Sequence, residues 1–151
     1  MKRNRPEEEA RIFLAQAENG VLSLITPEGE PYGVMVNHVY DEIDNCIFFH
    51  CANKGKKLDC IRANPQASFF AVSRNEILPA RYATHYDSVI VTGRASVVTE
   101  EDEKRRRLEL LCDRFSPGEA RREEVIQKSW NAVTICKVTI DSITGKSNRD
   151  E

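Results

Sequence analysis

Long apolar runs are absent from this sequence. The longest uninterrupted apolar stretches contain only a few residues, whereas a membrane-spanning helix needs about 20. The basic start at residues 1–6 is followed by glutamates at 7–9, not by the apolar segment of a secretory signal. We therefore expect a cytoplasmic protein without a membrane partner.

An excess of positive charge is also missing. The 22 Lys and Arg residues are balanced by 24 Asp and Glu residues, so the formal net charge is -2. No overall field draws such a chain to nucleic acid or anionic lipid, and an anion site has to be local. The arginines at 105–107 and 121–122 lie among acidic residues. This pattern predicts a salt-bridged, solvent-exposed face and no nucleic-acid partner.

Cysteine pairs with metal-site or disulfide spacing are lacking. The five cysteines are odd in number, and no two follow the Cys-x-x-Cys pattern, which argues against a zinc ribbon and a disulfide framework. Cys46, Cys112 and Cys136 stand in apolar surroundings, as small core residues do. We predict no metal site.

The remaining pattern predicts a mainly β fold. Strands are expected at 21–26, 32–40, 46–51, 66–73, 88–99 and 132–140, the first three as an antiparallel meander, with a bend or bulge at Gly93. Helices are expected at 6–17, 53–63, 100–115 and 119–128, and a loop at 74–85. Residues 1–151 then form one domain, a six-stranded antiparallel β-barrel with flanking helices. Residues 1–5 and 147–151 are expected to be flexible.

The turn after the third strand carries the strongest chemical signal. Gly55 is followed at once by Lys56 and Lys57, near the start of a helix that Asn53 is expected to cap. Helix N-termini attract anions, and cations there oppose the helix dipole unless an anion is bound. The turn is therefore either a local anion site or a solvated basic helix start. Its glycine and lysine spacing is not that of a Walker loop.

Polar residues in apolar strands give further candidates. Asn37 and His38 interrupt the apolar strand at 32–40 and need water or a partner; for His38 we expect water. His50 ends its strand, where contact with a ligand and a structural role fit equally well. Ser88 opens the fifth strand, and no nucleophile motif surrounds it.

Taken together, these segments resemble the pyridoxamine-5′-phosphate-oxidase-like FMN-binding split barrels, and among them the nitroimidazole-resistance (Nim-type) proteins. The resemblance extends from the first helix to Thr144-Gly145-Lys146. Its most specific segments are Gly20-Val21-Leu22-Ser23, Pro31 to Asn37, Ile47 to Ala52 leading into Gly55-Lys56-Lys57-Leu58, Asn64-Pro65 and Ser88 to Gly93.

The resemblance implies a split barrel that forms homodimers, with two flavins (FMN, or alternatively FAD) bound across the interface. It implies that Lys56 and Lys57 hold the flavin phosphate and that Ser88 makes a polar contact. The candidate contacts of the ring and ribityl chain are Val36, Asn37, His38, His50, Cys51 and Ala52. His38 stands where an aromatic residue is more usual in this branch. The arginine-rich substrate set of the vitamin-forming oxidases is missing near the C-terminus, so pyridoxine phosphate oxidation is not expected.

The implied activity is flavin-dependent redox chemistry. A reduced nicotinamide would donate electrons and a small nitroaromatic or quinone-like molecule would accept them, while the protein binds and orients the flavin. No side chain is an evident acid–base catalyst, so no catalytic residue is assigned. The alternative is a non-catalytic protein on the same barrel, serving as a flavin store, a redox sensor or a haem-binding module.

Overall fold

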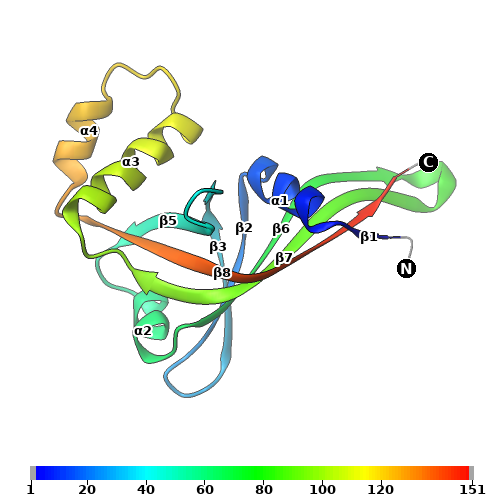
Figure 1. Cartoon of the computed structure of the whole chain (residues 1–151), viewed down its shortest axis with the longest axis horizontal. Helices are drawn as coiled ribbons and strands as arrows, with labels where there is room; N and C mark the ends of the chain where they lie inside the picture. Colours follow the sequence, from blue (N-terminus) through cyan, green and yellow to red (C-terminus); the bar gives the residue numbers. More distant parts are fainter. Residues whose placement is uncertain (1–2, 150–151) are drawn as a thin grey trace.

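A computed structural model describes residues 3–149 (Figure 1). The strands are β1 (Asn4–Arg5), β2 (Asn19–Ile25), β3 (Pro31–Asn37), β4 (Val39–Asp41), β5 (Cys46–Ala52), β6 (Gln66–Leu78), β7 (Ala83–Val97) and β8 (Val133–Asn148). The helices are α1 (Glu7–Gln16), α2 (Lys56–Ala63), α3 (Glu101–Phe115) and α4 (Arg122–Ser129), with a short 3-10 turn, η1, at Pro79–Arg81. The predicted class is confirmed: the fold is mainly β, with helices flanking an antiparallel sheet.

The sheet contains eight strands among the described residues, not the six that were predicted. Its order is β3-β2-β6-β7-β8-β5-β4, with β1 paired to β8. The predicted meander is wrong, because the expected strand at 32–40 is two strands at opposite ends of this order. Only His38 separates β3 from β4 in the chain, so the sheet has to curl until its two ends meet. This curling makes the barrel.

Two apolar clusters hold the fold together. The larger one fills the barrel, where the alternating inward residues of β2 and β7 meet α1, whose buried residues are Ala10, Phe13 and Leu14. The smaller one lies outside it, where α3 and α4 cover Phe48 of β5 and Ile135 of β8. The first half of β5 and the start of β8 are therefore covered on both faces. Figure 1 shows the α3–α4 pair at one end of the molecule and the β6–β7 hairpin at the other.

Residues 74–85 form strands and a tight turn, not the predicted loop. β6 and β7 continue to pair from Arg74↔Asp87 to Leu78↔Ala83, and η1 closes the hairpin. The predicted flexible ends are also part of the sheet where they are described, because Asn4 pairs with Lys146 and Asp87 with Ser147. Residues 1–2 and 150–151 lie outside the described range. None of the helices at residues 3–149 has both the length and the apolar composition needed to cross a membrane.

The predicted irregularity at Gly93 is confirmed. The β7–β8 register shifts between Thr92 and Gly93. A Cβ atom at Gly93 would lie 2.0 Å from the carbonyl oxygen of Thr139, far inside van der Waals contact. Glycine at this position lets the two longest strands approach where the sheet bends.

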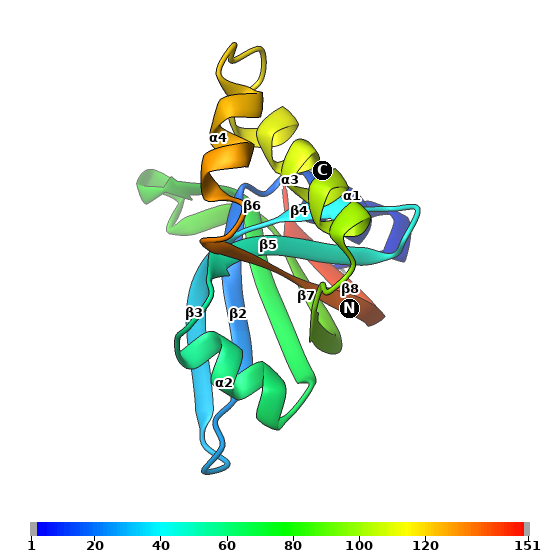
Figure 2. The ribbon, with the colours of Figure 1, turned by 90° about the vertical axis from the view of Figure 1, so that its left-hand side faces the viewer.

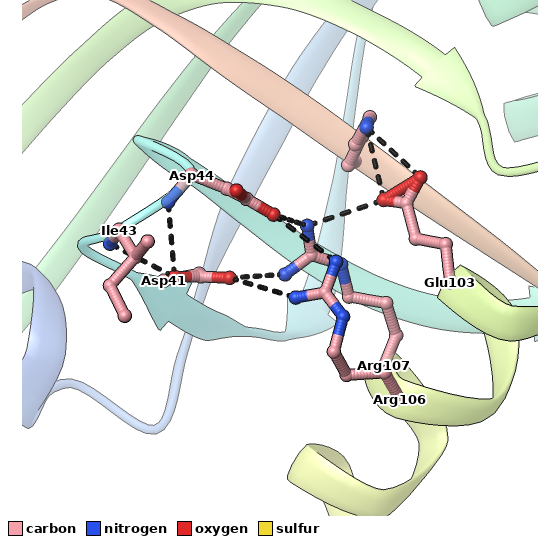
Figure 3. Close-up of polar contacts among 7 residues, drawn as sticks. Asp41, Ile43, Asp44, Glu103, Arg106 and Arg107 are labelled. Atoms are coloured by element: carbon pink, nitrogen blue, oxygen red, sulfur yellow. Dashed lines mark hydrogen bonds and ion pairs between the residues drawn. The ribbon is translucent and has the colours of Figure 1, made fainter.

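A buried arginine fastens α3 to the barrel, as Figure 3 shows. Arg107 is 0% exposed; its guanidinium pairs with Asp41 and Asp44 and lies 4.7 Å from the centre of the Phe48 ring. Glu103 receives hydrogen bonds from both Arg107 and Lys137. The predicted salt bridges around residues 105–107 are confirmed, but the prediction that this face is solvent-exposed is wrong for Arg107, whose partners come from the distant β4–β5 turn.

Candidate functional site

The N-terminus of α2 is open. Its N-cap residue is Gly55, with φ 148°, a conformation that side-chain-bearing residues rarely adopt, and no side chain caps the helix. The first backbone N–H groups therefore keep their hydrogen-bonding capacity. The sequence-based expectation that Asn53 caps this helix is wrong.

Asn53 instead ties the turn to the last strand. Its side-chain amide donates to the carbonyl of Asn131 over 2.6 Å, and the Thr134 hydroxyl donates to Asn53 Oδ1 over 2.7 Å. Asn53 thereby bridges the end of β5 to the start of β8 and leaves the helix start free. In Figure 2, α2 lies beside β2 and β3, below the crossing of these strands with β5.

Both lysines predicted at this turn lie at the open helix start. Lys56 is exposed, and its ammonium lies 4.6 Å from the centre of the Tyr32 ring on β3. Lys57 is half-buried and close enough to Cys51 to influence its pKa. Among residues 3–149, neither lysine forms an ion pair with a carboxylate. Two uncompensated cations and a set of free backbone N–H groups can hold an anionic group such as a phosphate.

The candidates on β5 lie directly before the turn. His50 and Ala52 are exposed, and Cys51 is half-buried between them. β5 therefore delivers three of the predicted residues to the same corner as the lysines. The backbone of this strand end is hydrogen-bonded to β8, with His50 opposite Ile135 and Ala52 opposite Val133, which fixes the direction of the turn.

Only the first part of β3 lies next to the lysine turn. Tyr32, at the start of β3, contacts Lys56. Asn37 is exposed at the other end of the strand, five residues or about 17 Å further on. Val36 is buried in the barrel core. The structure thus places β3 alongside the turn with Asn37 at the far end.

His38 lies away from these residues, in the core. It is 1% exposed, so the expectation that it faces water is wrong. Its Nε2–H donates to the carbonyl of Leu14 over 2.9 Å, and its ring packs edge-on against Phe69 at 4.7 Å. Burial lowers the pKa of His38, against a smaller opposing effect of the Leu14 hydrogen bond. A neutral histidine here links α1 to the point where β3 becomes β4.

Ser88 lies on the outer face of β7, in a separate hollow. A pocket of about 580 Å³ there is lined by β1, β6, β7 and β8 residues that include Phe70, Tyr86 and Lys146. No residue of α2 lines it. Within one chain, Ser88 and the lysine turn are therefore not parts of one pocket.

An exposed apolar row, which was not predicted from the sequence, crosses the outer face of the sheet. Met35 pairs with Val21, Val21 with Phe70, and Phe70 with Ile90, so the four side chains stand side by side on β3, β2, β6 and β7. Their exposed fractions are 61, 42, 43 and 44%. We call these four residues the outer stripe. The signal in the sequence is an outward-facing apolar residue on each strand, but it emerges only once the register is known.

Known proteins share this fold. A candidate 5-nitroimidazole antibiotic resistance protein from Bacteroides thetaiotaomicron superposes with a TM-score of 0.76 at 18% identity, covering 95% of this chain and 84% of that one. An FAD and heme binding protein from Mycobacterium smegmatis gives a TM-score of 0.80 at 19% identity, covering 99% and 75%. An FAD-binding protein from Mesorhizobium loti gives 0.71 at 20% identity, covering 97% and 98%.

Sequence comparison identifies the family. Comparison with curated proteins finds no match. The family model described as pyridoxamine 5'-phosphate oxidase matches residues 6–147, which is nearly the whole described chain and includes both the lysine turn and the outer stripe. The chain belongs to the pyridoxamine 5'-phosphate oxidase family.

Proposed function

We propose that this protein binds a flavin, FMN or FAD, and holds its phosphate at the start of α2. The observation that carries the proposal is the uncapped helix N-terminus with Lys56 and Lys57 beside it and no carboxylate paired to either lysine among residues 3–149. A bound phosphate would satisfy the free N–H groups and offset the two charges. Flavin binding by the solved neighbours from Mycobacterium smegmatis and Mesorhizobium loti supports this choice of anion.

The end of β5 beside the turn and the far end of β3 offer surface for the rest of the flavin. His50 and Ala52 offer exposed surface directly before the lysines, and Asn37 offers an exposed amide at the end of β3. These groups would orient the ribityl chain and ring and exclude water from one side. The bound flavin supplies the electron-transfer chemistry. His38 makes no part of this surface because it is enclosed in the core.

A second copy of the chain would complete the site. The outer stripe is a contiguous apolar surface, and such surfaces on a water-exposed sheet commonly mark an interface. Phe70 and Ile90 belong both to the stripe and to the pocket that contains Ser88. Packing of two copies through this face would bring the Ser88 pocket of each against its partner. We therefore propose a homodimer that holds two flavins near the interface.

Electron transfer to a small nitroaromatic or quinone-like acceptor, with a reduced nicotinamide as donor, is the activity we propose. The likeness to a candidate nitroimidazole-resistance protein supports this acceptor class. The alternative is a non-catalytic flavin or haem protein, which the likeness to an FAD and heme binding protein from Mycobacterium smegmatis supports.

Absorbance spectroscopy tests the proposal. Adding the purified protein to FMN or FAD is expected to shift and sharpen the flavin absorbance bands and to quench flavin fluorescence. The flavin that binds more tightly is identified as the cofactor. No spectral change with either flavin would overturn the proposal. Anaerobic addition of a reduced nicotinamide, followed by a nitroaromatic, then separates the two roles. Bleaching and recovery of the flavin bands support the oxidoreductase, whereas a bound flavin that stays oxidised supports the non-catalytic alternative. A Soret band would indicate haem.

Phe70→Asp is expected to break the dimer. In an isologous dimer the substitution occurs twice, so two central apolar contacts of about 2 kcal/mol each would be lost. The dissociation constant of the dimer would then rise by about 10³-fold. Light scattering should report twice the 17.2 kDa chain mass for the wild type and one chain mass for the variant.

Ile43→Asp is the matched control, because Ile43 is 96% exposed and lies outside the stripe. The control should remain dimeric. A monomeric wild type, or a Phe70→Asp variant as dimeric as the control, would exclude this interface while leaving flavin binding to be judged by the titration.

A further inference from the structure

Two cysteines face each other inside the barrel, next to the lysine turn. Cys51 of β5 and Cys136 of β8 have their Sγ atoms 4.0 Å apart. They are diagonal neighbours on paired strands, since Cys51 pairs with Thr134 and Phe49 pairs with Cys136. Cys136 is fully buried, whereas Cys51 is half-buried at the end of its strand. One sulfur is thus accessible and the other is held directly behind it.

The surroundings of Cys51 favour its thiolate. Either sulfur can donate the hydrogen bond between them. Donation from Cys136 stabilises the Cys51 thiolate and lowers the pKa of Cys51 to about 7 against an opposing effect of burial, with further help from the charges of Lys57 and Arg62. The same hydrogen bond and burial raise the pKa of Cys136. At neutral pH a nucleophilic thiolate is therefore available at Cys51, while Cys136 keeps its proton.

Within residues 3–149, none of the other three cysteines has this environment. Cys46 and Cys60 are buried, and burial raises the pKa of Cys46. Cys112 is half-buried in the cluster under α3. Cys112 is half-buried like Cys51, but no thiol among residues 3–149 is hydrogen-bonded to it, so it provides an internal comparison.

The end of β5 is paired with a neighbouring strand on one side only. β4 pairs only with residues 46–48 of β5, so the segment around Cys51 is hydrogen-bonded on one side, and the strand ends one residue later at Ala52. A disulfide requires the sulfur separation to fall from 4.0 Å to about 2.05 Å. Because the two cysteines are diagonal neighbours, this approach requires rotation of both side chains and a shift of the strand end.

We propose that Cys51 and Cys136 form a redox couple that a hydroperoxide oxidises. The Cys51 thiolate attacks the terminal peroxide oxygen, the O–O bond breaks, and the leaving alkoxide or hydroxide takes a proton to become an alcohol or water. The Cys51 sulfenic acid is then attacked by the Cys136 sulfur, which forms the S–S bond and releases the oxygen as water. Two thiols lose two electrons and two protons, and the hydroperoxide gains them. This chemistry needs no flavin.

Intact mass spectrometry and peptide mapping test the couple. Reduced, flavin-free protein is treated with a small excess of tert-butyl hydroperoxide. The wild type is expected to lose the mass of two hydrogens and to yield one cross-linked peptide pair containing Cys51 and Cys136. Cys136→Ser should instead gain one oxygen at Cys51, trapped by dimedone. Cys51→Ser should do neither.

Cys112→Ser is the control and should oxidise as the wild type does. Because Cys136 is fully buried, Cys136→Ala is made alongside Cys136→Ser, and circular dichroism verifies that each is folded; the wild-type peptide map decides the pairing on its own. A disulfide joining other cysteines, an oxidised wild type without a disulfide, or a Cys51→Ser variant that is oxidised as fast as the wild type would each overturn the proposal. None of these results bears on the flavin titration.

Discussion

Replacing Lys56 and Lys57 together by alanine weakens FMN binding by about 10²–10⁴-fold. Each lysine contributes one charge-assisted contact to the phosphate, worth about 1.5–3 kcal/mol, and the two contacts act on the same group. Since neither lysine has an ion-pair partner within residues 3–149, their removal leaves no carboxylate unpaired. The loss is therefore expected in affinity and not in the fold, and a fluorescence-quenching titration measures it.

Lys54→Ala is the matched control for this pair. Lys54 carries the same charge on the same turn but precedes Gly55 and lies outside α2. It should change the FMN affinity only slightly, through the general field of the turn. The wild-type affinity should also fall with added salt more steeply than that of the double variant. A double variant that binds FMN as the wild type does would place the phosphate elsewhere.

Arg107→Ala destabilises the protein by about 3–5 kcal/mol, the cost of removing one partner from a buried charge cluster. The substitution would leave Asp41, Asp44 and Glu103 without the guanidinium that pairs with all three. It would also remove a cation from the Phe48 ring and open a cavity beneath α3. Urea unfolding followed by circular dichroism should show a lower midpoint with a nearly unchanged slope.

Arg106→Ala shows how much of the stability loss comes from burial of the arginine and how much from its charge alone. Arg106 contacts Asp41 and Asp44 as well, at 3.6 and 3.3 Å, but its side chain is half-exposed. Exposed ion pairs contribute about 0–1 kcal/mol, so this variant should be nearly as stable as the wild type. Equal losses for the two variants would contradict the role assigned to Arg107.

The difference in the free energy of unfolding between the wild type and Arg107→Ala should become smaller in acid. Burial raises the pKa of Asp41, but hydrogen bonds from Arg107 and two backbone amides outweigh it, and the net pKa is lowered. The pKa of Glu103 is likewise lowered, since hydrogen bonds from Lys137 and Arg107 outweigh the effect of burial. Carboxyls with depressed folded-state pKa values stabilise the fold above their unfolded pKa of about 4 and lose that contribution as the pH falls below it. Urea titrations from pH 7 to about pH 3 measure this convergence.

Periodicity made the core of the fold predictable. β2, β5 and α1 have clear apolar spacing bounded by turn residues, and the structure places them within a residue or two of the expected limits. The break at His38 was hidden because the alternation of Val34, Val36 and His38 continues through it. Residues 74–85 look like a loop because the extended hairpin has no core to face. Arg107 resembles its exposed neighbours, since burial depends on partners at residues 41–44.

The candidate site was predictable where it is continuous in the chain. His50 to Lys57 follow one another, so the sequence alone could place them at one corner. The cap at Gly55, the contact of Tyr32 with Lys56, and the approach of Cys136 to Cys51 depend on how β3 and β8 pack. The outer stripe depends on the pairing register, which a one-residue shift would abolish.

The two strands at the ends of the sheet order bear on aggregation. Unpaired strand edges are where copies of a chain add to one another and grow into fibrils. Here β4 has only three residues. β3 begins with Pro31, which has no N–H to donate, and the Lys56 ammonium lies over the ring of Tyr32 on the same strand. Growth by edge addition is thus discouraged at both ends. If the proposed homodimer forms through the outer stripe, the blunted edges would keep it a closed pair and prevent growth into polymers.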